Sequence, residues 1–341
     1  MNEHPAKITA MDVARLAGVS QSAVSRVFTP GASASKATAE KVRAAAVQLG
    51  YRPDPLARAM ITGRTRIIGL VVAYLENQFY PMAIELLSRS LQEKGYHVLV
   101  FMAENSTEKV PQVMQELLDY RVDGIVTASV AMTNDLTARC RAVGIPVVMF
   151  NRGQDAAGLS EVTSDNVAGG RKAAGHLLET GHRRIAHIMG WQGSSTGRDR
   201  AQGFQEALGL AGQKPFAMID GMYSRDEAAR ATCSLFAGPD RPDAIFVGND
   251  HMAFAVMDTL RFDLALSVPG DVSVIGYDDV PLASWPSYNL TTIRQPVRRM
   301  VEATVDILLN HIEGETAPSR IRIDGPLIVR GSTRSREEGL A

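Results

Sequence analysis

The 341-residue sequence has only two cysteines, 6% aromatic residues and a formal net charge of -1. Cys140 and Cys233 are far apart and too few for a disulfide framework, which favours a reducing, cytoplasmic compartment. The longest apolar run, from Ile67 to Leu75, is far shorter than the ~20 residues that span a bilayer. The first residues carry charge and lack the apolar core of a secretory signal. We therefore expect neither secretion nor membrane insertion.

Several enzyme signatures are also missing. The sequence contains no G-x-G-x-x-G nucleotide-binding fingerprint, no G-x-x-x-x-G-K-S/T phosphate loop and no H-E-x-x-H zinc motif. His176, His182 and His187 come nearest to a metal cluster, but the first falls in a predicted helix and the last in a predicted strand. These histidines are expected to be structural, and no metal or cofactor is expected.

The small net charge hides a segregation of charge along the chain. Residues 1–66 contain ten basic and four acidic residues, a net charge of +6, so the remainder carries -7. A basic module joined to a mildly acidic body is typical of a nucleic-acid binder with a separate ligand domain. A solvated basic tail is the alternative.

The basic segment predicts three short helices. Their expected N-caps are Thr9, Ser20 and Ser35, and glycines 18 and 50 end the first and third helices. Asp12 completes a T-x-x-D capping box with Thr9. The expected inward positions, at helical spacing, are Val13, Leu16, Ala17, Val24, Val27, Val42, Ala45, Ala46 and Leu49.

This arrangement leaves Gln21, Ser22, Ser25 and Arg26 facing outward on the second helix. Two helices joined by a tight glycine turn form a helix-turn-helix, which can place its second helix in a DNA major groove. Arg26 suits guanine, Gln21 suits adenine, and Ser22 can contact either base. A small helical bundle with a solvated face is the alternative.

From Ile67 onward, apolar runs alternate with amphipathic segments. The predicted strands are 67–73, 97–101, 124–127, 146–150, 185–189, 244–247 and 272–277, and the predicted helices include 82–94, 166–180, 200–210 and 250–261. Such alternation predicts parallel sheets covered on both faces. Six or more units exceed one comfortable sheet, so we expect two α/β subdomains.

Specific motifs identify a family. The runs ITAMDVARLAGVSQSAVSRVF (8–28) and GYRPDPLARAMITGRT (50–65) resemble the DNA-binding head and linker of the lactose-repressor (LacI/GalR) family. Further landmarks in the order of that family are Asp165-Asn166 with Gly169-Gly170, Gly181–Ile185, Arg200 with Gly203-Phe204, Gly248–Asp250, Val274–Asp279 and Leu290–Pro296. The resemblance covers nearly the whole chain.

The resemblance implies an α helix-turn-helix head and an α/β body of two doubly wound parallel-sheet subdomains, similar to periplasmic binding proteins. The implied divisions are a head over 1–53, a hinge linker over 54–66, an N-terminal effector subdomain over 67–165 plus 295–322, and a C-terminal effector subdomain over 166–294 plus 323–341. It also implies a homodimer on a pseudo-palindromic operator.

The resemblance implies two sets of site residues. The expected DNA contacts are Thr9, Ser20, Gln21, Ser22, Ser25, Arg26, Tyr51 and Met60. Met60 stands where the family has a leucine that wedges into the minor groove, and an unbranched apolar side chain can still unstack a base step. A packing residue between head and body is the alternative role for Met60.

The expected effector contacts are Phe79, Tyr80, Asn151, Ser194, Thr196, Arg200, Tyr223, Asn249 and Asp278. A polyol needs bidentate partners such as Asp278 and Arg200, together with amides, hydroxyls and aromatic faces. The alternatives are a buried structural ion pair and aromatic core residues. Trp191 and Trp285 match no pocket position and are expected to pack in the fold.

Together these features predict a cytoplasmic, dimeric, ligand-responsive repressor of genes for a sugar or a related carbon source. Its partners would be operator DNA and a small effector, with no membrane. A solute-binding protein for a sugar is the alternative, disfavoured by the basic head and the missing signal; an enzyme ranks third. The effector, the operator, the direction of the response, and dimer against tetramer stay open at this stage.

Overall fold

The chain divides into two units, Met1–Arg66 and Ile67–Ala341. The computed structural model describes residues 8–29, 32–52, 63–103, 109–130, 138–140, 142–154, 158–315 and 317–335. Within these ranges, no helix is long and apolar enough to cross a membrane.

The described residues of the first unit, the head, form three helices. They are α1 (Ala10–Ala17), α2 (Gln21–Phe28) and α3 (Lys36–Leu49). All three predicted N-caps are confirmed, as are the capping box at the start of α1 and the left-handed glycines that end α1 and α3. The buried core consists of Val13, Ala14, Val24, Val42, Ala45 and Ala46. Leu16 was wrongly predicted inside: it is 47% exposed, because Ala14 takes the inward position beside Val13.

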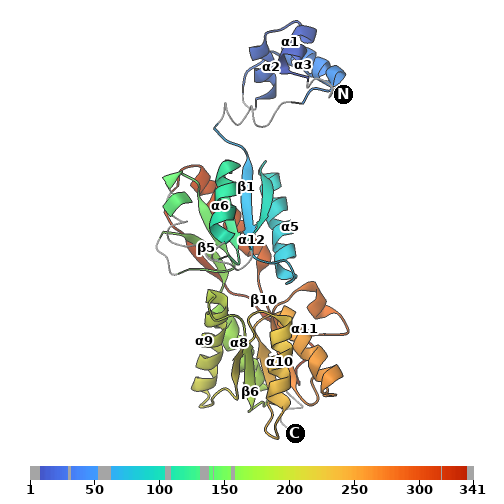
Figure 1. Cartoon of the computed structure of the whole chain (residues 1–341), viewed down its shortest axis with the longest axis vertical. Coiled ribbons are helices and arrows are strands. Elements are labelled where there is room, and N and C mark those ends of the chain that lie inside the picture. Colours follow the sequence, from blue (N-terminus) through green and yellow to red (C-terminus); the bar gives the residue numbers. More distant parts are fainter. Residues whose placement is uncertain are drawn as a thin grey trace. The chain divides into compact units, whose positions relative to one another are not determined.

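In its described residues the second unit, the body, contains two six-stranded sheets (Figure 1), which confirms the prediction of two α/β subdomains. The first sheet has the order β11-β5-β4-β3-β1-β2 and the second β12-β10-β9-β8-β6-β7. The first comprises β1 (Ile67–Val72), β2 (His97–Met102), β3 (Gly124–Ala128), β4 (Val147–Phe150), β5 (Ser160–Ser164) and β11 (Arg320–Ile323). The second comprises β6 (Ile185–Met189), β7 (Met218–Asp220), β8 (Ala244–Val247), β9 (Ser273–Asp278), β10 (Thr291–Arg294) and β12 (Leu327–Ile328). All pairings are parallel except β10 with β12.

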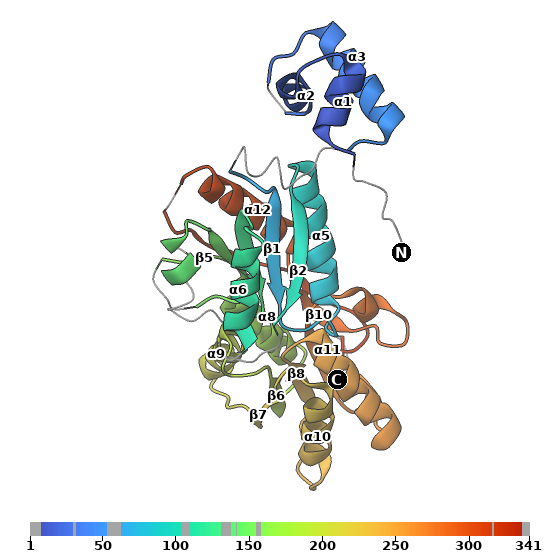
Figure 2. The ribbon, with the colours of Figure 1, turned by 45° about the horizontal axis from the view of Figure 1, so that its top comes forward.

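The first sheet and its helices form the first lobe. Alternate residues of β1 point to opposite faces: Leu70 joins the core with α5 (Phe79–Glu93) and α12 (Val297–Ile312), whereas Val71 joins the core with α6 (Lys109–Asp119). Figure 2 shows β1 and β2 between α5 and α6. The sheet is therefore covered on both faces, which explains its continuous apolar runs.

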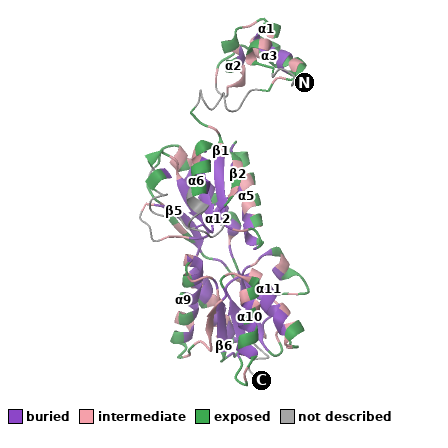
Figure 3. Ribbon diagram, in the orientation of Figure 1, coloured by how far each residue is buried: buried purple, intermediate pink, exposed green. Residues whose placement is uncertain are grey.

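The second sheet and its helices form the second lobe. The helices α8 (Asn166–Glu179) and α9 (Ser195–Leu210) pack together, and so do α10 (Arg225–Phe236) and α11 (Asp250–Asp258). After α11 the predicted helix continues as a π-helical turn, Thr259–Asp263, and a short 3-10 helix spans Pro281–Ser284. Buried residues gather in the strands, and the outer faces of the helices are exposed (Figure 3).

The chain passes between the lobes three times: between β5 and α8, between β10 and α12, and between β11 and β12. In parallel sheets the carboxyl ends of the strands share one edge, where ligands usually bind. Residues that follow β1, β4, β8 and β9 come together between the two lobes. This meeting of strand ends forms the cleft described next.

Candidate functional site

Helix α2 presents an exposed polar face. Gln21, Ser22, Ser25 and Arg26 are all exposed, as predicted, while Val24 on the opposite side is buried. Within residues 8–29 and 32–52, Arg26 makes no ion pair, so its guanidinium is free to bind a base or a phosphate. This face has the donors and acceptors that major-groove base edges require.

The other predicted DNA contacts are placed differently. The Thr9 hydroxyl donates to Asp12 at 2.7 Å, and Ser20 Oγ accepts from Ala23 N, so both side chains already cap helices. Tyr51 is half-buried with its ring 6.0 Å from Phe28. Met60 lies outside the described residues. The α2 face is therefore the part of this set that is both exposed and free of capping duties.

The cleft between the lobes brings together seven of the nine predicted effector residues. Its lining residues are Tyr74, Asn77, Tyr80, Asn151, Arg152, Thr196, Arg200, Tyr223, Asn249 and Asp278. The first five come from the first lobe and the others from the second. The lobes are closed on one another, and the space left is about 10 Å³, roughly what one water molecule needs. A sugar-sized ligand would therefore enter only as the lobes separate.

A buried ion pair lies at the centre of this cleft. Arg200 Nη2 lies 3.7 Å from Asp278 Oδ1, with both side chains at most 3% exposed. Arg200 also donates to Asn166 Oδ1 and to the Gly248 carbonyl, and its guanidinium stacks 3.6 Å from the Tyr277 ring centre. These bonds hold the guanidinium in one orientation, which is what bidentate recognition requires.

Several side-chain contacts connect the lobes across the cleft, and two of them are hydrogen bonds that involve Asn77 and Gly153. Asn77 Nδ2 of the first lobe donates to Asp278 Oδ2 at 3.1 Å, while Gln295 donates to the other carboxylate oxygen. Gly153 N donates to Ser195 Oγ at 3.0 Å. Burial raises the pKa of Asp278, and the facing Arg200 opposes that rise. Ligand hydroxyls could replace the Asn77 bond, so ligand binding and lobe closure would act on the same carboxylate.

Two predicted effector residues do not line the cleft. Phe79 is fully buried and stacks on Phe150 in the core, because successive helical residues point about 100° apart and Tyr80 takes the cleft side. Ser194 instead caps α9 by accepting from Gly197 N. Of the tryptophans, Trp285 is 56% exposed, so its predicted packing role is wrong.

The sequence interpretation missed three lining residues, Tyr74, Asn77 and Arg152. They follow β1 and β4, and position at a strand end was the available signal. It also overlooked that Gly193 to Gly197 fits the G-x-S-x-G hydrolase pattern. There Ser195 begins α9, and its hydroxyl bonds Gly153 rather than any histidine of the described chain.

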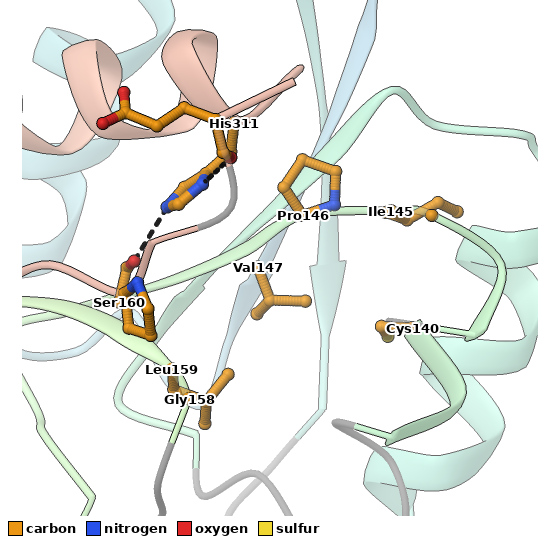
Figure 4. Close-up of a pocket in the computed structure, with 11 residues that line it drawn as sticks. Cys140, Ile145, Pro146, Val147, Gly158, Leu159, Ser160 and His311 are labelled. Carbon is orange, nitrogen blue, oxygen red and sulfur yellow. Dashed lines mark hydrogen bonds between the residues drawn. The ribbon is translucent and has the colours of Figure 1, made fainter. Parts of the chain in front are cut away.

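A larger pocket, of about 440 Å³, lies elsewhere in the body (Figure 4). Its wall is mostly apolar and includes Cys140, Ile145 and Val147; on one side Ser160 and His311 are hydrogen-bonded at 2.9 Å. None of the predicted effector residues lines it. Among the described residues, no group of three or more histidines, cysteines or carboxylates could hold a metal ion.

A second buried carboxylate, Asp250, lies close to the ion pair. It accepts bonds from Thr292 Oγ1 and Val280 N, and burial raises its pKa to about 8, with Asp278 adding to the rise. Asp278 faces a guanidinium and Asp250 contacts none within the described ranges. We therefore assign the proton to Asp250 at neutral pH.

This assignment predicts a pH dependence of folding. A carboxyl whose pKa rises from 3.8 to about 8 on folding binds a proton only in the folded state between those values, so stability falls as pH rises through that window. Asp250→Asn stays neutral. From about pH 6 to pH 8, the wild type should lose about 2 kcal/mol more unfolding free energy than the variant. Urea unfolding followed by tryptophan fluorescence measures the unfolding free energy at each pH. The same pH dependence in wild type and Asp250→Asn would contradict the assignment. Asp240→Asn, at an exposed carboxylate, is the control and should behave as wild type.

Comparison with known proteins supports both halves of the chain. Residues 9–54 match the model "Bacterial regulatory proteins, lacI family", and residues 174–333 match the "Periplasmic binding protein-like domain". The chain is 34% identical to the ribose operon repressor of Escherichia coli, over 95% of this chain and 99% of that protein. It is 32% identical to the HTH-type transcriptional repressor PurR of Photobacterium profundum, over 96% and 98%.

Solved structures agree. A Lac repressor dimer bound to operator and the anti-inducer ONPF superposes with a TM-score of 0.87 at 28% identity, covering 96% of this chain and 99% of that one. The transcriptional regulator CelR in complex with cellobiose gives 0.72 at 33% identity, covering 95% and 99%. The helix-turn-helix head, the two-lobed body and these full-length similarities lead to one assignment: the chain belongs to the lacI family of bacterial regulatory proteins.

Proposed function

We propose that the protein is a ligand-responsive transcriptional repressor that binds operator DNA through its head and a small effector through the cleft of its body. One observation carries this proposal: a single chain holds both an exposed polar face on α2 and a cleft whose lobes meet through the Asp278 carboxylate. The first can contact bases, and the second can respond to a ligand. This is a regulatory role rather than an enzymatic one.

The response requires no chemistry, only linkage. An effector that binds two body conformations with different affinities shifts the population between them, and DNA selects one of the two. The contacts Asn77–Asp278 and Gly153–Ser195 run from one lobe to the other, so separation of the lobes would break them. They supply the differential interactions that linkage needs.

For the DNA side, we propose that Arg26, Gln21 and Ser22 contact bases. Thr9, Ser20, Ser25 and Tyr51 would support binding around them, and Met60 would act at the operator centre, a role that rests on the family resemblance. Because the solved Lac repressor is a dimer on operator, we infer a dimer here, with one head on each half-site of a pseudo-palindrome.

For the effector side, we propose that Arg200 and Asp278 bind ligand hydroxyls, with Tyr80, Asn151, Thr196, Tyr223 and Asn249 around them. A sugar or a related carbon source suits this donor and acceptor set, and cellobiose is the ligand of the similar CelR structure. The proposed divisions are 1–53, 54–66, 67–165 with 295–322, and 166–294 with 323–341; the proposed compartment is the cytoplasm.

A solute-binding protein would share the two-lobed body and would need no head. Selection from a random DNA library separates these functions. A repressor should enrich one pseudo-palindromic sequence, and a variant lacking residues 1–66 should enrich none while still binding ligand. Full chain that selects no sequence would contradict the proposal.

The Arg26→Ala variant tests the base-contacting role. Loss of a bidentate base contact should lower affinity for the selected operator by about 1–3 kcal/mol and relax the preference at one base pair in each half-site. Fluorescence anisotropy at fixed salt, on operators with single substitutions, measures both effects. Arg43→Ala, at an exposed position of α3, is the control and should retain the base-pair preference. Equal weakening on all sequences would instead make Arg26 a phosphate contact.

A further inference from the structure

Arg152 is a buried cation with unused bonding capacity. It follows β4 in the wall of the cleft and is 6% exposed. Its Nη1 donates to the Ser129 carbonyl at 2.9 Å, whereas its Nε has no hydrogen-bond partner. The rings of Trp191 and Tyr223 lie 5.9 and 5.5 Å from the guanidinium carbon. In the part of the chain that the structure describes, no carboxylate lies within ion-pair distance.

The neighbouring charges leave this cation uncompensated. Arg200 and Asp278 face one another, so the charge of that carboxylate is already paired, and Asn77 and Gln295 also donate to it. An arginine stays protonated even when buried. Because a buried charge without a partner is costly, proteins keep one where a counter-charge arrives.

Two residues next to Arg152 also carry buried polar atoms without a hydrogen-bond partner. Ser129, whose carbonyl holds the guanidinium, has a buried hydroxyl with no partner. The adjacent Asn151 donates to Tyr80 at 3.0 Å, but its Oδ1 is buried and unpartnered. The guanidinium and the hydroxyl can both donate to an anion, and the amide oxygen can accept from a hydroxyl next to it.

We propose that the effector is an anion: a hydroxylated small molecule whose carboxylate or phosphate group binds Arg152 and the Ser129 hydroxyl. A hydroxyl of the same molecule donates to Asn151 Oδ1, and other hydroxyls reach Asp278 and Arg200. This inference rests on the proposed effector role of the cleft and narrows it to negatively charged ligands. A neutral sugar would leave the Arg152 charge unmatched.

The two tryptophans allow a test confined to the body. Both Trp191 and Trp285 lie beyond residue 66, so tryptophan fluorescence follows unfolding of the body and not anion binding to the basic head. The probe is inorganic phosphate, titrated into the full chain at constant ionic strength with chloride. At about 50 mM phosphate, the wild-type melting temperature should rise by about 5 °C and approach saturation.

The variants decide whether Arg152 is responsible. Arg152→Gln should keep only the general salting effect of phosphate, and Arg152→Lys should keep part of the specific rise. Arg184→Gln, at an exposed arginine of the second lobe, should match wild type. An equal rise in wild type and Arg152→Gln, or no specific rise in wild type, would overturn the proposal. Loss of stability in Arg152→Gln without a change in the phosphate-dependent rise would make Arg152 a structural residue.

Titrations with two organic anions distinguish a carboxylate ligand from a phosphate ligand. D-gluconate carries the carboxylate and glucose 6-phosphate the phosphate, and D-glucose is their neutral counterpart. The anion that raises the melting temperature more than D-glucose does, and only when Arg152 is present, shows whether the bound group is a carboxylate or a phosphate. Operator selection by the head is measured separately, so failure of the repressor function and failure of the anion site give different results.

Discussion

Replacing Asp278 by asparagine is expected to abolish the ligand response while DNA binding survives. The substitution keeps the shape but exchanges a charged acceptor for a neutral amide. Because a hydrogen bond to a charged group contributes about 1.5–3 kcal/mol, loss of one such bond should weaken effector binding roughly 10- to 150-fold. The head is a separate unit and is untouched. Operator affinity, measured by anisotropy during titration with a compound that stabilises wild type, should therefore stay constant in the variant.

The same substitution leaves Arg200 with neutral partners, namely Asn166 and the Gly248 carbonyl, so the body should also lose stability. Asn77→Ala serves as a second variant, because it removes one hydrogen bond between the lobes and keeps the buried charge pair. It should alter the size of the response and preserve folding. Asp240→Asn, at a side chain 89% exposed, should respond as wild type. A normal ligand response in Asp278→Asn would show that the carboxylate is structural.

Replacing Gly203 by alanine is expected to lower the unfolding free energy of the body by about 3 kcal/mol, or roughly 6–12 °C in melting temperature. A Cβ at Gly203 would lie 2.0 Å from the Val167 carbonyl oxygen, and one at Gly170 would lie 2.2 Å from the Arg200 carbonyl oxygen. These are backbone atoms, so relief requires α8 and α9 to separate. That separation would also pull Arg200 from Asn166 and weaken effector binding.

A matched control lies on the same helix. A Cβ at Gly209 meets nothing within 4 Å, and alanine is favoured over glycine in a helix by up to about 1 kcal/mol. Gly209→Ala should therefore equal or exceed wild type in melting temperature. Equal melting temperatures for Gly203→Ala and Gly209→Ala would contradict the close packing of α8 and α9.

Much of the fold could be predicted because residues close together in the sequence determine the helix ends and the apolar runs become buried. The caps at Thr9, Ser20 and Ser35 satisfy backbone donors within three residues, so sequence alone locates the helix starts. Strand β5 was missed because its five residues include two serines, a threonine and a glutamate, and all five are buried. Their polarity is satisfied from distant segments: Ser160 bonds His311, and Ser164 bonds Gln295. Such partners are unknown before the chain folds.

The cleft residues also fall into those that the sequence predicted and those that it did not. Arg200 and Asp278 were identified through the family resemblance, and the structure brings them together. Asn77 and Arg152 were missed because loops after separate strands converge only when both lobes are formed. Phe79 and Tyr80 are neighbours in sequence, yet Phe79 lies in the core and Tyr80 in the cleft. Which of the two faces the cleft depends on how α5 is rotated against its sheet, and the sequence does not give that rotation.

The central claim is that effector and DNA binding are coupled, and the operator Kd with and without bound effector tests it most directly. A compound that raises the tryptophan-monitored melting temperature is first identified, and the operator Kd is then measured by anisotropy at one fixed salt concentration, because phosphate contacts make affinity salt-dependent. The account predicts that saturating compound changes the Kd by roughly 5- to 150-fold, with the direction distinguishing inducer from corepressor. An unchanged Kd at full occupancy of the cleft would contradict it.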